Sequence, residues 1–83
     1  MGITITYATY GTTNNNMDVT QVCQSIVDTG NDDITVNNAT MGGDPDPGVV
    51  KSFAIVYILP GATNPECYTT QTATEGQIVD LVP

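Results

Sequence analysis

The chain opens on a strict alternation of apolar and polar side chains. Ile3, Ile5 and Tyr7 are separated by threonines, and this period of two is typical of a strand that buries one face. We therefore predict a strand over about residues 3–10. The polar residues over 11–16 favour a loop, because short polar side chains hydrogen-bond the neighbouring backbone and compete with regular structure.

The period then changes to that of a helix. From residue 19 to residue 27, apolar side chains recur at offsets of three, four, seven and eight, which places them on one helical stripe. We predict a helix over about residues 18–29. Asp18 is expected to cap its first turn, and Gly30 is expected to close its far end in a left-handed conformation.

The rest of the chain is predicted as strands separated by turns. A short strand covers residues 34–36, and the glycine- and proline-rich segment 40–48 is expected to be irregular. Residues 49–59 are apolar on both faces, which is typical of a central strand. The threonine-rich segment 66–73 is expected to pair beside it at an edge of the sheet, and residues 78–82 form a last strand.

These elements predict an α+β fold in which residues 1–83 form a single small domain. We expect a four- to five-stranded, mostly antiparallel sheet with the helix packed on one face. The 83 residues are enough for one hydrophobic core. Because such a core leaves little material for an enclosed cavity, any binding site is expected to be shallow.

The charge composition excludes several classes of function. The chain contains one Lys or Arg, nine Asp or Glu and no His, for a net charge of -8. A single cation, Lys51, cannot neutralise a phosphate backbone, so we expect no nucleic-acid partner. The longest strongly apolar run, residues 53–59, is far shorter than the roughly 20 residues of a membrane-spanning helix, so no membrane insertion is expected. Without an imidazole base or a deep cleft, we expect no enzymatic activity.

Acidic side chains in two turns are candidate ligands for calcium. Asp32 and Asp33 lie in one turn, and Asp44 and Asp46 flank prolines in another. Hard oxygen ligands on loops suit Ca²⁺, although their spacing is not that of an EF-hand. Aspartate is also common in turns without a metal, because its side chain bonds the following backbone. Both interpretations stay open, and no other cofactor is expected.

Two cysteines and one asparagine are candidates for covalent modification. Cys23 lies on the helical stripe and Cys67 near the start of the polar strand. A disulfide between them would close a loop of about 45 residues, stabilise the fold by roughly 4 kcal/mol and favour an extracellular location. In the alternative, both are reduced and Cys23 is a small buried apolar residue. Asn38 begins an Asn-Ala-Thr sequence that matches the N-glycosylation pattern.

Three short motifs occur in an order found in a known family. They are Tyr-Ala-Thr-Tyr-Gly at 7–11, Asp-Val-Thr at 18–20, and the Asp-Pro-Asp-Pro-Gly run that leads to Lys51 and a tyrosine-containing strand. Over residues 7–59 the chain resembles the C-terminal domain of unknown function of mitochondrial DnaJ-related proteins. The chain has no J domain, so the resemblance implies a compact interaction domain without catalytic residues rather than a chaperone role.

The surface chemistry favours binding or assembly. Hydroxyl and amide side chains are abundant, and lysine, which commonly blocks the pairing of exposed sheet edges, is nearly absent. The negative charge opposes self-association unless it is screened. We expect a non-catalytic binding or structural module that forms a homo-oligomer or docks a protein partner through its sheet. A small lectin-like domain that stacks glycans on tyrosines, or a calcium-dependent binding module, are the alternatives. The tyrosines are Tyr7, Tyr10, Tyr57 and Tyr68.

Overall fold

The computed structural model describes residues 2–62 and 67–82. These residues form two antiparallel sheets: a four-stranded sheet of order β2-β1-β4-β5 and a two-stranded sheet of β3 and β6. The predicted α+β fold is thereby confirmed. The elements are, in chain order, β1 (Thr4–Gly11), β2 (Asn16–Asp18), α1 (Thr20–Asp28), β3 (Asp33–Thr35), α2 (Asn38–Met41), β4 (Ser52–Ile58), β5 (Thr69–Thr74) and β6 (Ile78–Asp80).

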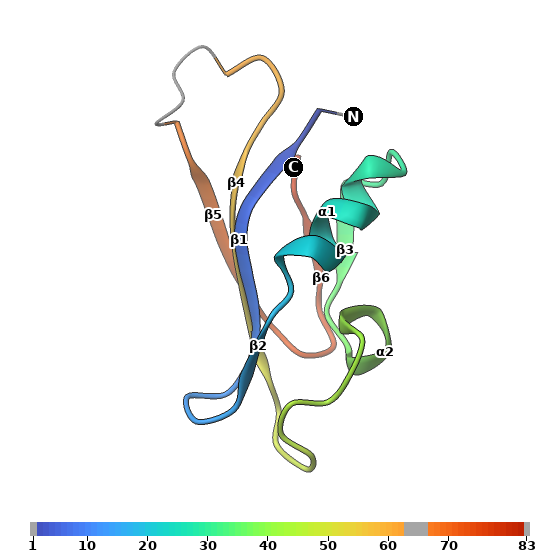
Figure 1. The fold of residues 1–83 in the computed structure, drawn as a ribbon, viewed down its shortest axis with the longest axis vertical. Coiled ribbons are helices and arrows are strands. Elements are labelled where there is room, and N and C mark those ends of the chain that lie inside the picture. The colour runs from blue at the N-terminus through green and yellow to red at the C-terminus, as the bar shows by residue number, and fades with distance from the viewer. Residues whose placement is uncertain (1, 63–66, 83) are drawn as a thin grey trace.

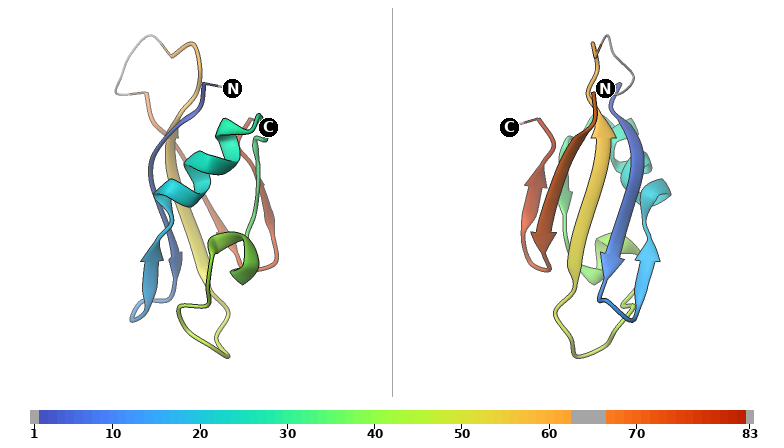
Figure 2. Two further views of the ribbon diagram at one scale, coloured as in Figure 1. Left: turned by 45° about the vertical axis from the view of Figure 1, so that its right-hand side comes forward. Right: turned by 90° about the vertical axis from the view of Figure 1, so that its left-hand side faces the viewer.

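The molecule has two layers. The four-stranded sheet forms one, and α1, α2 and the β3–β6 pair cover a single face of it (Figure 1). The core fills the space between the layers. Its largest fully buried side chains are Tyr10, Tyr57, Phe53, Ile34, Met41, Ile55, Leu81, Val19, Val27, Val36 and Cys23. The opposite face of the sheet carries no other described element, as the right-hand view of Figure 2 shows.

A β-bulge in β1 corrects the predicted position of Tyr7. Ile5 pairs with Tyr57 but Tyr7 pairs with Val56, so Thr6 is an extra residue that shifts the alternation by one position. As a result the Tyr7 side chain lies on the uncovered face and is 48% exposed. The prediction that the regular alternation continues to Tyr7 is wrong.

Helix α1 begins two residues later than the sequence predicts. Asp18 belongs to β2, where it pairs with Thr9, so Val19 takes the N-cap position. The Asp18 carboxylate still accepts the backbone N–H of Thr20 at 2.9 Å, which satisfies one of the free donors of the first turn. At the other end Gly30 has φ 95° and donates its N–H to the oxygen of Val27, so the predicted left-handed ending is confirmed.

The central strand lies where the sequence predicts it. β4 pairs with β1 on one side and β5 on the other, and its alternate residues Phe53, Ile55 and Tyr57 are buried. It begins only at Ser52, because the preceding residues belong to the proline-rich segment. β5 is an edge strand, as predicted. The beginning of the predicted strand over 66–73 lies in part outside the described residues.

Two features of the second layer differ from expectation. β6 pairs with β3 rather than extending the main sheet. Part of the segment predicted as irregular forms α2, a single helical turn that buries Met41. The turn is stable because the Asn37 side chain accepts the N–H of Thr40 at 2.7 Å and Gly42 closes it with φ 90°.

Candidate functional site

One face of the four-stranded sheet is uncovered in the described part of the chain. The strand registers place Tyr7 and Thr9 of β1 beside Val56 and Ala54 of β4. On the far side of β4, a row of threonines from β5 completes the face. The threonines are Thr70, Thr72 and Thr74. The face therefore combines hydroxyl groups with small apolar side chains.

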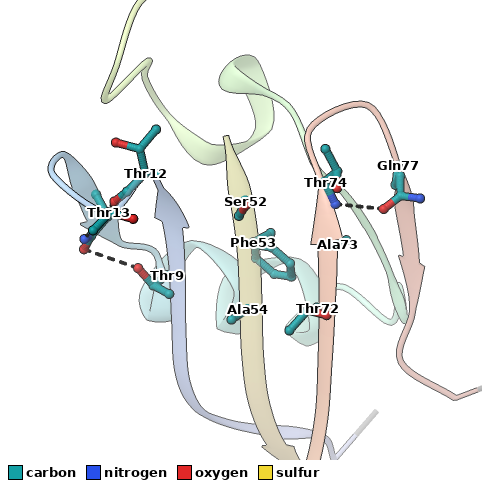
Figure 3. Close-up of a pocket in the computed structure, with 12 residues that line it drawn as sticks. Thr9, Thr12, Thr13, Ser52, Phe53, Ala54, Thr72, Ala73, Thr74 and Gln77 are labelled. Atoms are coloured by element: carbon teal, nitrogen blue, oxygen red, sulfur yellow. Dashed lines mark hydrogen bonds between the residues drawn. The ribbon is translucent and has the colours of Figure 1, made fainter. Parts of the chain in front are cut away.

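A shallow groove of about 590 Å³ lies at one end of this face. It is formed by β1 and the turn after it, by the first residues of β4, and by the end of β5 (Figure 3). No charged side chain lines it among the described residues, although the chain has a net charge of -8. At its rim Gln77 is held in place, because its Oε1 accepts the backbone N–H of Thr74 at 2.7 Å.

One edge of this sheet is closed. Three residues of β1, numbers 9–11, pair with β2. Earlier in β1, outward backbone groups form hydrogen bonds with α1 and with Val19, the residue before α1. Ala8 accepts the backbone N–H of Val19 at 2.9 Å and donates its own N–H to Thr20 Oγ1 at 3.0 Å. Further along, the N–H of Ile5 donates to Gln24 Oε1 at 2.8 Å. Because these groups occupy the outward backbone of β1 at Ile5 and Ala8, no further strand can pair with this part of β1.

The other edge, along β5, has no paired strand among the described residues, although β6 lies beside it (Figure 2) and Gln77 bonds both outward backbone groups of Thr74. The N–H of Glu75 donates to the backbone oxygen of Lys51 at 2.9 Å. Because alternate residues of an antiparallel strand bond the same neighbour, the backbone groups of residues 69, 71 and 73 also face β4. The backbone N–H and C=O groups of Thr70 and Thr72 therefore point away from the sheet. In the described part of the chain, β5 pairs with β4 alone. Its sequence Thr-Thr-Gln-Thr-Ala-Thr contains no charge, proline or glycine that would block a further strand.

The only basic side chain of the protein is committed to the fold. Lys51 is 2% exposed, and its Nζ lies 2.7 Å from Asp44 Oδ1, 3.1 Å from the oxygen of Asp46 and 3.5 Å from Glu75 Oε1. Hydrogen bonding to Lys51 lowers the pKa of Asp44, and the same bond raises the pKa of Lys51. Lys51 thus fastens the proline-rich loop to the end of β5 and does not present a cation to a ligand.

The four candidate calcium ligands are not brought together. Asp44 binds Lys51, and Asp46 Oδ2 accepts the hydroxyl of Thr12 at 2.9 Å. Asp32 and Asp33 instead lie with Asp80, their carboxylate oxygens within 4.8 Å of one another. The sequence analysis missed Asp80, which joins the cluster only because β6 pairs with β3.

The cluster of Asp32, Asp33 and Asp80 lies mostly exposed on the second layer. The pKa of Asp33 is raised by partial loss of hydration and then by repulsion from Asp32 and Asp80. Such a group of carboxylates can attract a cation, and it also occurs on protein surfaces without one.

The two cysteines are both free in the structure. Cys23 is fully buried under the sheet, whereas Cys67 is exposed before β5. The disulfide between them is not formed, so this argument for an extracellular location falls away. Burial raises the pKa of Cys23 to about 12, which keeps the thiol protonated and unreactive.

The glycosylation candidate and two of the tyrosines serve the core. Asn38 Oδ1 accepts the hydroxyl of Tyr10 at 2.6 Å, and burial raises the pKa of Tyr10. Tyr57 is also fully buried, so neither ring can stack on a ligand. Tyr7 and Tyr68, at 48% and 52% exposure, are the tyrosines that reach the surface.

Comparisons with protein-family models, with curated proteins and with solved structures give no match to this chain. The resemblance to the domain of DnaJ-related proteins therefore stays a prediction. In the described part of the chain, no helix is long and apolar enough to span a membrane.

Proposed function

We propose that the protein is a non-catalytic assembly module that pairs with a second copy of itself through the edge of β5. The observation that carries this proposal is the contrast between the two edges of the main sheet. Hydrogen bonds from α1 close the edge at β1, whereas on the uncharged strand β5 the outward backbone groups of Thr70 and Thr72 have no partner among the described residues. An open edge of this kind is a template for a further strand.

The phase of the β5 backbone specifies how two copies would meet. Thr70 and Thr72 direct their backbone groups outward, so an antiparallel pair centred on Gln71 sets Thr70 opposite the partner's Thr72. Each such pair exchanges both backbone hydrogen bonds. The contact is isologous, so it closes as a dimer and does not propagate into a fibre.

Charge supports this edge and predicts its salt dependence. β5 carries no ionisable side chain, and Asp18 lies on β2 at the far edge of the sheet. Asp80 lies nearer, because Gln71 Nε2 donates to its backbone oxygen at 2.7 Å. Two chains of charge -8 repel each other, and salt screens this repulsion. The dimer should therefore strengthen as the salt concentration rises.

Light scattering behind a sizing column, at low and high salt, tests the proposal. We expect a mass of twice the 8.7 kDa monomer, more completely at high salt. Thr70→Pro removes an outward N–H that has no acceptor among the described residues, and it should give a monomer. Thr70→Val keeps that N–H and serves as the matched control, which should remain dimeric.

The melting curve of Thr70→Pro shows whether the variant is folded. Thr72→Pro provides a second substitution at an outward position if the first one does not fold. A wild-type chain that stays monomeric at millimolar concentration in high salt would exclude pairing through β5. A folded Thr70→Pro that dimerises as well as Thr70→Val would exclude it equally.

A further inference from the structure

The groove at the end of the uncovered face contains polar groups with unused hydrogen-bonding capacity. The hydroxyls of Ser52, Thr72 and Thr74 line it and make no hydrogen bond to the described protein. The amide nitrogen of Gln77 is also available, while its oxygen is held by the N–H of Thr74 (Figure 3). Hydroxyls and an amide provide both donors and acceptors within one groove.

The described lining of the groove carries no charged side chain, and the nearby carboxylate of Asp46 is bonded to the Thr12 hydroxyl, which indicates a neutral ligand. A cation would find no carboxylate among the described lining residues, and an anion would approach a chain of charge -8 without a basic side chain to bind it. The only lysine, Lys51, is buried against Asp44. A ligand recognised here must therefore be uncharged and rich in hydrogen-bonding groups.

An apolar strip continues from the groove along the sheet. Ala54 lines the groove, and Val56 follows it on the same face of β4, about 7 Å further along the strand. Tyr7 pairs with Val56 and exposes 48% of its surface. A half-exposed aromatic ring beside aliphatic side chains is suited to the C–H face of a sugar ring.

From these features we propose that the groove and Tyr7 together bind a neutral oligosaccharide. One sugar lies in the groove with its hydroxyls bonded to Ser52, Thr72 and Gln77, and a following unit lies on Tyr7. A single sugar cannot reach both places, so the site selects chains over monosaccharides. The site uses the Thr72 side chain, whereas assembly through β5 uses the Thr72 backbone, so the two proposals can be tested separately.

An NMR titration of the isotope-labelled protein tests this proposal. The probes are maltotetraose, cellotetraose and tetra-N-acetylchitotetraose, with glucose and a sialylated trisaccharide for comparison. At least one neutral tetrasaccharide should shift the backbone amides of residues 52–56 and 72–74. Glucose should bind more weakly, and the sialylated trisaccharide should not bind.

Two variants locate the contact. Thr72→Val should weaken binding about 5-fold through loss of one hydrogen bond, and Tyr7→Ala about 10-fold through loss of stacking. Thr35→Val, at an exposed position of β3 in the other layer, is the matched control and should leave the affinity unchanged. Neither Thr72→Val nor Tyr7→Ala should alter the mass in solution, so a failure here is distinguishable from a failure of assembly.

Three results would overturn the proposal. The first is that none of the neutral tetrasaccharides shifts the backbone amides at a concentration of about 10 mM, which is on the order of the weakest dissociation constant that would count as binding. The second is binding that Thr72→Val and Tyr7→Ala both leave intact. The third is a sialylated trisaccharide that binds as well as its neutral counterparts.

Discussion

Replacing Tyr57 with phenylalanine should destabilise the protein through one lost hydroxyl. Tyr57 is fully buried in β4, and its hydroxyl donates to the backbone oxygen of Leu81 at 2.7 Å. The same hydroxyl accepts Gln71 Nε2 at 2.9 Å. Tyr57 thus ties the main sheet to the residue after β6. Phenylalanine fills the same ring volume, so the change isolates these hydrogen bonds from core packing.

The expected cost follows from what each partner retains. Gln71 keeps a second acceptor, the oxygen of Asp80 at 2.7 Å, whereas the buried oxygen of Leu81 loses the donor that Tyr57 supplied. Leaving a buried polar group unpaired costs about 1–3 kcal/mol, so we expect a loss of about 2 kcal/mol. For a domain of this size that corresponds to a decrease in Tm of roughly 8–16 °C.

Tyr10→Phe is the matched comparison, because its hydroxyl bonds a partly exposed side chain. Asn38 Oδ1, which accepts the Tyr10 hydroxyl at 2.6 Å, can turn to water when the hydroxyl is removed. We expect that variant to lose about 1 kcal/mol. Urea unfolding of both proteins, with unchanged slopes, measures the difference. If Tyr57→Phe costs no more than Tyr10→Phe, the assumed role of the buried Leu81 oxygen is wrong.

Three further predictions concern ionisation. The pKa of Asp44 is lowered in the fold, so its ion pair with Lys51 stabilises the protein above pH 3.8, and this stabilisation is lost as the pH falls through the lowered pKa. Lys51→Met should therefore be less stable than the wild type at pH 7, and its Tm should fall less on acidification. The pKa of Asp33 is raised, so its carboxylate destabilises the fold as the pH rises above 3.8. Asp33→Asn should therefore have a higher Tm than the wild type at pH 7, and this difference in Tm should disappear at acidic pH. A thiol reagent should label Cys67 in the folded protein and Cys23 only on unfolding. A reductant should leave Tm unchanged, and a Tm that falls in reductant would indicate a disulfide.

The elements that could be predicted from the sequence are those with a local cause. Side-chain periodicity predicts the apolar stripe of α1 and the apolar residues on both faces of β4. Gly30 ends the helix because it adopts a left-handed conformation that glycine favours. The exposure of Tyr7 has no such local cause. It results from a bulge at Thr6, which is defined only by the pairing of β1 with β4.

The candidate site depends still more on tertiary pairing. The polar composition of β5 predicts an edge strand. The closure of β1 on the opposite side depends on Gln24, which in the sequence resembles any polar residue on the exposed face of a helix. Asp80 joins Asp33 only through the β3–β6 pairing. The groove likewise combines residues from three strands, so no spacing within the sequence identifies it.

The two proposals together predict a dependence of glycan binding on assembly. A dimer paired through β5 carries two grooves on one continuous sheet, and linked sites bind a surface of many glycans about 10²- to 10⁴-fold more tightly than single sites do. Thr70 lies outside the groove lining, so Thr70→Pro should leave the affinity for a free tetrasaccharide unchanged while it weakens binding to a glycan-coated surface. Thr72→Val should weaken both, because it alters each groove and leaves the dimer intact. Equal binding of Thr70→Pro and wild type to the coated surface would mean that the two copies do not act together.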